Sequence, residues 1–400
     1  MSLKYQFLRF NLLFIPRVII SLLVFTSCNK SELPIKNIFI KTDLNTPVDY
    51  NIKEIIPIPD NTFWIHSEKS GAPYEDKIEH YDENFKLLDQ VNFKNIRFGN
   101  FVVNGNNNIV VAILRNYPLL NYGKHQFLQF DNHINIIAQD TSDLIDTKLA
   151  PMDPFISNIN LLTRLTNEKY ILGFNTFKTN GTINDTSRII MASYLNPILS
   201  PMPLWVNHNR YFNYSLGITS PRLVDLEADK HNNYYALAET DGPFGVFRKH
   251  DSVGRMIWQT KFPTDYNWPY GNEIKLMVEE ERIWATIDRK LYSCDLQGNL
   301  TSTDLAGRSF YNAIPLSNKE GYIAVSDSEN VSGRYTRVLK LDHNFNAVKA
   351  KLYGNQETQG AIIGRLANGK IVVASFVIAP NRNDYHLMLL KMNDELELVN

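Results

Sequence analysis

The chain has 400 residues and a formal net charge of −1, and 44% of its residues are hydrophobic and 12% aromatic. This composition favours a large β-rich core. The near-neutral charge excludes a global electrostatic attraction to nucleic acid, so we expect no nucleic-acid partner.

Residues 1–27 are predicted to be a signal peptide. Residues 1–17 contain Lys4, Arg9 and Arg17 but no acidic residue, and residues 18–25 form a short apolar run. This order of a cationic and then an apolar segment is typical of a secretory signal. The apolar run is too short to span a membrane, which takes about 20 residues.

Two small residues, Thr26 and Ser27, separate this run from Cys28. The sequence Phe25-Thr26-Ser27-Cys28 resembles a lipobox, the signal-peptidase II site of bacterial lipoproteins, in the relaxed form common in the Bacteroidetes group. Phe25 departs from the usual Leu. The resemblance implies cleavage before Cys28, acylation of its thiol and a lipid-anchored protein of the outer membrane. Residues 28–36 would be the tether, and whether the protein faces the periplasm or the cell surface stays open.

Cys294 is the only other cysteine. With Cys28 acylated, no disulfide can form within the chain, so the fold depends on its core. We interpret Cys294 as a small strand residue packed in a sheet rather than as a redox or metal-binding residue.

A unit of about 50 residues recurs seven times in the remaining sequence. Its first part is a polar turn followed by an apolar strand, and it begins at positions 60, 106, 167, 231, 280, 319 and 368. Its second part is a strand that runs into a turn, usually at Asp or Asn, and the turn begins at positions 82, 131, 195, 251, 295, 342 and 393.

Each unit has room for about four short strands joined by hairpin turns, such as Asn368-Gly369 and Asp251-Ser-Val-Gly254. No sustained period of 3.6 residues predicts a helix. We therefore predict an all-β fold, a seven-bladed β-propeller of four-stranded blades over residues 37–400. A β-sandwich, the main alternative, would not produce seven similar units.

The strand–turn–strand at 249–262 resembles that of Bacteroidetes secreted propellers with the pattern K-x-D-x-x-G-x-x-x-W. Residues 340–348 and 295–300 match it in part. The glycine survives only at Gly254 and Gly298, and the tryptophan only at Trp258. The resemblance implies a fold and no particular activity.

The segment 37–42 is an apolar strand outside the seven units. We expect it to complete or flank the last blade, which otherwise ends in an open edge. The tether would then join the disc at its rim.

Loop lengths predict a binding face. Connections between second and third strands, such as 67–77 and 326–335, and between blades, such as 139–157, are long, and in a propeller both kinds emerge on the same face. On this face, Tyr266, Trp268 and Tyr270 alternate with polar residues, and Tyr211 and Tyr214 form a second candidate group. Their rings suit stacking on a sugar or capture of a peptide, and the alternative is that they fill the gaps between blades.

No local motif for catalysis, phosphate binding or metal binding occurs in the sequence, so we predict no catalytic residue, no metal site and no cofactor. The favoured hypothesis is a binding or scaffold lipoprotein that presents its long-loop face to a glycan, peptide or protein. A hydrolase or lyase acting on polysaccharides at the central channel is the second hypothesis, and an envelope-assembly scaffold is the third. The oligomeric state stays open.

Overall fold

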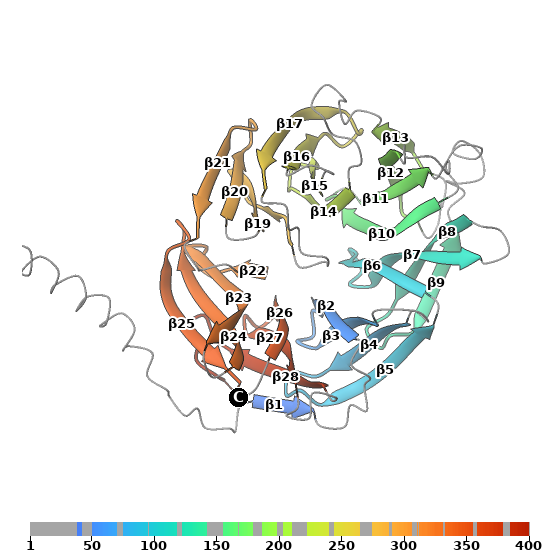
Figure 1. Ribbon diagram of the computed structural model, residues 1–400. Helices are drawn as coiled ribbons and strands as arrows, with labels where there is room; N and C mark the ends of the chain where they lie inside the picture. The colour runs from blue at the N-terminus through green and yellow to red at the C-terminus, as the bar shows by residue number, and fades with distance from the viewer. Residues whose placement is uncertain are drawn as a thin grey trace, which may run out of the picture. The chain divides into compact units, whose positions relative to one another are not determined.

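The computed structural model describes residues 38–399 of the chain apart from a set of short gaps. The gaps are 42–49, 70–74, 95, 118–121, 142–154, 167, 179–185, 198–202, 210–221, 240–243, 265–273, 288–289, 306–309, 311, 331–332, 355–357 and 379–384. The described residues form seven four-stranded antiparallel sheets arranged in a ring around a central channel (Figure 1). The predicted all-β, seven-bladed propeller is confirmed.

Blades 1 to 6 each take four consecutive strands, the first innermost and the fourth outermost. Blade 1 is β2 (Tyr50–Pro57), β3 (Phe63–Lys69), β4 (Glu75–Tyr81) and β5 (Leu87–Lys94); blade 2 is β6 (Ile96–Val103), β7 (Ile109–Tyr117), β8 (Tyr122–Phe130) and β9 (Ile136–Thr141). Blade 3 is β10 (Phe155–Arg164), β11 (Lys169–Lys178), β12 (Thr186–Leu195) and β13 (Trp205–Asn209); blade 4 is β14 (Arg222–Ala228), β15 (Tyr234–Glu239), β16 (Phe244–His250) and β17 (Met256–Pro263). Blade 5 is β18 (Met277–Val278), β19 (Arg282–Ile287), β20 (Lys290–Asp295) and β21 (Leu300–Asp304); blade 6 is β22 (Asn312–Pro315), β23 (Gly321–Asn330), β24 (Gly333–Asp342) and β25 (Ala347–Tyr353).

Blade 7 closes the ring with both ends of the domain. It contains β26 (Thr358–Arg365), β27 (Ile371–Ile378) and β28 (Tyr385–Met392), and its outermost strand is β1 (Ile38–Lys41). β1 pairs antiparallel with β28, with Ile38 opposite Leu390 and Lys41 opposite Leu387. The expected closing strand is thus confirmed, and it covers an edge that would otherwise present unpaired backbone groups.

The turn that follows the third strand has one design in six blades. In blade 6, the Phe345 amide donates to the Asp342 carbonyl at 3.0 Å, and the Asp342 carboxylate accepts the amides of Asn344 and Asn346. Phe345 itself has φ of 63°, so the turn is a type I turn followed by a left-handed residue. The Asp or Asn that the repeat places at each such turn is there because its side chain satisfies two turn amides.

The left-handed position of this turn is filled in two ways. In blades 4 and 5 it is Gly254 and Gly298, and a Cβ on either glycine would lie within 3.0 Å of an indole of the preceding blade, Trp205 or Trp258. In blades 1, 2, 6 and 7 it is a buried apolar residue: Phe85, Ile134, Phe345 and Leu396. The repeat glycine is absent from these four blades for a physical reason. Their turn residue fills the space between blades that an indole fills in blades 4 and 5.

Hydrophobic clusters lie between adjacent blades, as expected for a propeller. Cys294 is fully buried in the cluster of blades 4 and 5, and burial raises the pKa of its thiol to about 12. This confirms its interpretation as a packed strand residue. In the described part of the chain, no helix is long and apolar enough to cross a membrane.

Candidate functional site

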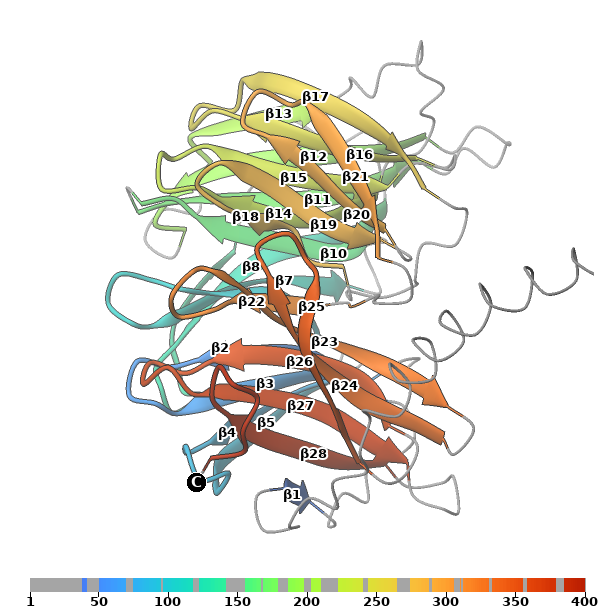
Figure 2. The same cartoon turned by 90° about the vertical axis from the view of Figure 1, so that its left-hand side faces the viewer.

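The two faces of the disc differ in how the strands are connected. Turns between first and second and between third and fourth strands lie on one face, which we call the turn face (Figure 2). Strand ends on the opposite face, the loop face, are joined by longer segments such as 142–154, 210–221 and 265–273. The predicted asymmetry is therefore present in the connections between blades 2 and 3, 3 and 4, and 4 and 5.

The connections between second and third strands are shorter than predicted, because the paired strands extend into them. β3 and β4 leave 70–74 of the predicted 67–77. β23 and β24 remain paired as far as Asn330 and Gly333, so their connection is 331–332 rather than most of 326–335. A hairpin that projects beyond the apolar core needs only backbone pairing, and polar side chains do not interrupt it. The apolar pattern therefore underestimates the length of the strands.

The predicted binding residues Tyr266, Trp268, Tyr270, Tyr211 and Tyr214 lie outside the described residues. The lipidation residue, Cys28, lies outside them as well. They stay predictions. The candidate site among the described residues consists of other side chains.

A cavity of about 580 Å³ opens at the central channel. It is lined by innermost-strand residues of blades 1 to 4 and by the segment that leads into blade 5, including Glu54, Asn100, Arg164, Glu227 and Lys275. Five blades thus contribute to one cavity, which contains both acidic and basic side chains.

Several channel side chains connect one blade to the backbone of the next. The Glu54 carboxylate accepts the Phe101 amide at 3.2 Å, and the Asp225 carboxylate accepts the Leu276 amide at 2.7 Å. Asn100 accepts the amide of Leu162 and donates to its carbonyl. Buried backbone groups require such partners, so these side chains hold the inner strands in register.

Lys275 lies among three acidic side chains of the channel. Burial disfavours its charge, but the carboxylates of Asp225, Glu54 and Glu227 outweigh burial and raise the pKa of Lys275. Burial and the Asp225 charge raise the pKa of Glu227 to about 8, and burial raises that of Glu54 despite the nearby Lys275. The cavity therefore contains a carboxyl group that exchanges a proton near neutral pH.

Sequence reasoning did not identify these residues, because they come from separate blades and form no local motif. The sequence feature that could have indicated them is a charged residue in an innermost strand, where the repeat is otherwise apolar. Among the described residues, no three His, Cys, Asp or Glu side chains are placed to hold a metal ion.

A second cavity, of about 530 Å³, lies on the turn face between blades 4, 5 and 6. It forms beside the first hairpin of blade 5, which is shorter than the others because the Glu279 amide pairs with the Arg282 carbonyl. Two of its ionic groups are already engaged: Glu279 accepts from Trp284 at 2.6 Å and from Tyr322, and pairs with Arg282 at 2.9 Å. This network stabilises the turn rather than presenting a reactive group.

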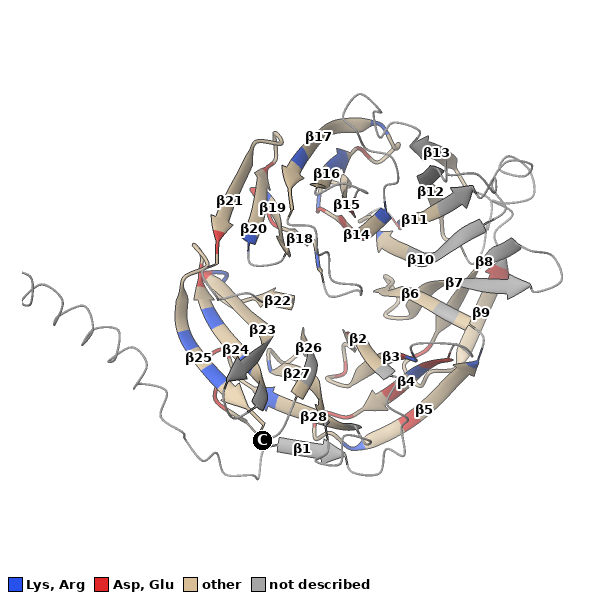
Figure 3. Cartoon of the chain, in the orientation of Figure 1, with Lys and Arg blue, Asp and Glu red and all other residues tan. Residues whose placement is uncertain are grey.

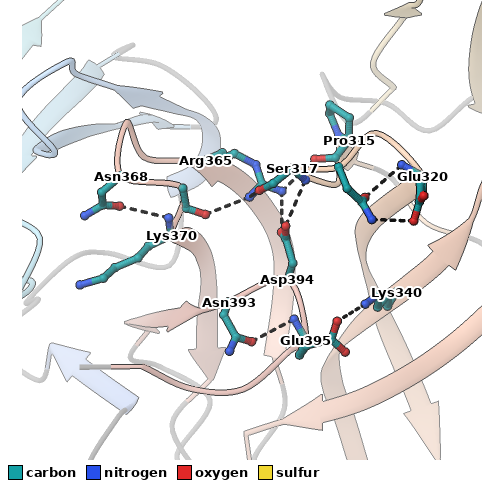
Figure 4. Close-up of polar contacts among 12 residues, drawn as sticks. Pro315, Ser317, Glu320, Lys340, Arg365, Asn368, Lys370, Asn393, Asp394 and Glu395 are labelled. Atoms are coloured by element: carbon teal, nitrogen blue, oxygen red, sulfur yellow. Dashed lines mark hydrogen bonds and ion pairs between the residues drawn. The ribbon is translucent and has the colours of Figure 1, made fainter.

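The turn face of blades 6 and 7 is fixed in a similar way (Figure 4). Arg365 donates to the carbonyls of Gly369 and Pro315 and pairs with Asp394 at 2.8 Å. Burial opposes the charge of Asp394, but hydrogen bonds from Ser317 and Arg365 lower its pKa. The short turns of this face are structural elements.

The chain matches no protein-family model and no curated protein. Among solved structures it resembles the polysaccharide lyase Uly1, with a TM-score of 0.50 and 9% identity over 86% of this chain and 90% of that one. It also resembles the β-propeller domain of the Trilobed protease from Pyrococcus furiosus, with a TM-score of 0.48 and 8% identity over 88% of this chain and 98% of that one. At these identities the likeness concerns the fold alone, which is that of a seven-bladed β-propeller.

Proposed function

We propose that this protein is a binding or scaffold lipoprotein, anchored in the outer membrane through Cys28, whose loop face engages a glycan, peptide or protein. The observation that carries the proposal is the asymmetry of the disc, with hydrogen-bonded turns on one face and the long connections between blades 2 to 5 on the other. Binding residues usually lie in long loops positioned by a rigid scaffold.

The chemistry of the channel supports a binding role. Glu54 and Asp225 each accept a backbone amide of the next blade, and Lys275 lies in the field of three carboxylates. These groups are used to join blades, so the cavity is a rigid polar hub. A rigid hub favours a binding surface because little conformational entropy is lost when the ligand binds.

The test is a binding comparison on the full-length protein. A triple variant with Tyr266→Ala, Trp268→Ala and Tyr270→Ala is expected to lose binding to glycan-array or envelope-protein ligands that the unchanged protein retains. The matched control is a triple alanine variant of exposed turn-face residues: His231, His343 and Lys319. Unchanged binding in the loop-face variant, with loss in the control, would place the binding site on the turn face.

A second candidate function is acid–base catalysis on a polysaccharide at the channel cavity. It is favoured by the pKa of Glu227, about 8, beside Arg164 and Lys275 in the same cavity. It predicts turnover in a glycan panel that Glu227→Gln lowers by about 10²-fold or more. An envelope-assembly scaffold would instead co-purify with a membrane complex and show neither turnover nor affinity for soluble glycans.

A further inference from the structure

Exposed large apolar side chains occur in one zone of the described structure. They are Leu87, Leu88, Ile136, Ile137, Leu195, Leu204, Val253, Met256, Ile257, Val348 and Leu352. Nearly all lie in or directly after the turn between third and fourth strands, at the start of the outermost strand of their blade. Apart from Leu352, which lies near the other end of β25, they form an apolar edge around the outer wall of the disc, next to the turn face.

The polypeptide enters the domain at this same edge. β28 ends at Met392, directly before the turn that begins at Asn393, and Ile38 pairs with Leu390 near that end. β1 therefore starts on the turn-face side of blade 7. In the ring, β25 and β5 flank β1, whereas β17 lies on the far side (Figure 1).

β25 is the most apolar of the flanking strands. Val348 is 65% exposed and Leu352 38% exposed, so the outward side of this strand presents apolar groups to solvent. Its alternate residues Lys349 and Lys351 are partly buried, and the Lys349 ammonium donates to the Glu395 carbonyl of blade 7 at 2.7 Å. Figure 3 marks further Lys and Arg residues on the adjacent strands β24 and β28, where Lys340 pairs with Glu395 and Lys391 donates to the Glu83 carbonyl.

We propose that this sector of the apolar edge, formed by Leu87 and Leu88 of β5 with Val348 of β25, rests on the lipid surface. The proposal depends on acylation of Cys28, the proposed anchor. Nine residues, 29–37, separate Cys28 from β1, and the ten steps from Cys28 to Ile38 span at most about 36 Å, so the anchor keeps this sector near the bilayer. Exposed apolar side chains held beside a lipid anchor are stabilised when they enter the acyl boundary of the bilayer.

The sector contacts the membrane by its edge and not by the whole turn face. The turns of that face contain ion pairs such as Arg365–Asp394 and Lys370–Glu83, which remain hydrated. An edge contact inserts the apolar groups beside β1 and leaves these pairs in water. It also turns the loop face away from the lipid, where a partner can reach it.

The test uses the full-length lipidated protein in liposomes. Single cysteines at Leu88, Val348 or Ile257 are labelled with an environment-sensitive fluorophore, and lipids with quenchers at known depth are added. The buried Cys294, with its thiol pKa of about 12, stays unlabelled at pH 7, and the Cys28 thiol is acylated. Ile257, on β17, is the matched control because it is 53% exposed on the same edge but across the ring.

We expect labels at positions 88 and 348 to be quenched at least about twofold more than the label at 257, because only the near sector reaches the acyl boundary. Equal quenching at all three positions would mean that the turn face lies flat, and no quenching would mean that the edge stays in water. Either result overturns the proposal. Flotation of the unchanged protein and of Cys28→Ser reports anchoring separately, so failure of the anchor is distinguished from failure of the edge contact.

Discussion

Neighbouring blades are joined by opposite chemistry in two regions of this propeller. The hub consists of the channel side chains, including Glu54, Asn100 and Asp225, and the rim consists of the turns that follow the third strands. At the hub, carboxylates and an amide side chain accept backbone amides of the next blade, as Asp225 does from Leu276. At the rim, aromatic and aliphatic side chains pack beneath the outer turns, as Phe345 does against Trp284 with ring centroids 4.9 Å apart. Hub contacts are directional, whereas rim contacts depend mainly on filled volume.

This difference explains which positions of the repeat can vary. The space between two blades can be filled by a side chain of either blade. In blade 5 the turn has Gly298 and the space is filled by Trp258 of the preceding blade, whereas in blade 6 the turn itself supplies Phe345. A hub contact needs a specific donor and a specific acceptor at one distance. We therefore expect rim variants to be compensated by a neighbour more readily than hub variants.

The largest expected effect is at the rim, where Phe345→Ala removes a buried ring. Phe345 is 4% exposed and stacks on Tyr322 at 4.8 Å, so its loss is expected to lower the free energy of unfolding by about 3–4 kcal/mol. Phe345→Gly is expected to cost about 1 kcal/mol less than Phe345→Ala, because glycine adopts the left-handed conformation without strain. Urea unfolding measures both, with the exposed Val348→Ala as control. A loss below about 1 kcal/mol for Phe345→Ala would contradict the role assigned to the rim.

At the hub, Lys275→Met is expected to lower the free energy of unfolding by about 2 kcal/mol at pH 7, because Asp225 and the acidic side chains beside it lose their positive neighbour. The cost should shrink as the pH is lowered, since protonation of the carboxyls removes their repulsion. Lys349→Met, which changes a surface lysine bonded to one carbonyl, is the matched control. An equally large effect in the control, or no dependence on pH, would show that the hub charges are not coupled.

Blade 5 allows a direct test of whether a glycine turn can be replaced by a phenylalanine turn. Trp258→Ala opens a space above Gly298, and Gly298→Phe alone would clash, since its Cβ lies 3.0 Å from the indole. The double variant should be more stable than the sum of the two single changes by about 1–2 kcal/mol. A double-mutant cycle in urea measures this coupling energy. Additive losses would mean that the phenylalanine turns and the glycine turns are not interchangeable.

The sequence predicted the ring because each blade repeats two local signals, and both are structural. Asp82, Asp131, Asp251, Asp295 and Asp342 mark turns because their carboxylates bind turn amides, a contact made within five residues. The hub could not be predicted in this way. Glu54, Asp225 and Lys275 are far apart in the sequence, and only closure of the ring brings their charges within range of one another.

The smallest expected effect separates the charge of the hub from its shape. Glu227→Gln keeps the volume of the side chain and removes its ionisation. The pKa of Glu227 is raised from 4.5 to about 8 in the folded protein, so between these values the folded state retains a proton that the unfolded state has lost. The stability of the unchanged protein should therefore fall as the pH rises through this window, relative to the variant. Because the cavity is partly open to water, we expect the advantage of Glu227→Gln to reach only about 1 kcal/mol at pH 8.5 and to vanish near pH 4.5. Urea unfolding at pH 4.5, 6.5 and 8.5 measures the difference, and a constant difference across the three would show that Glu227 acts in the hub through packing alone.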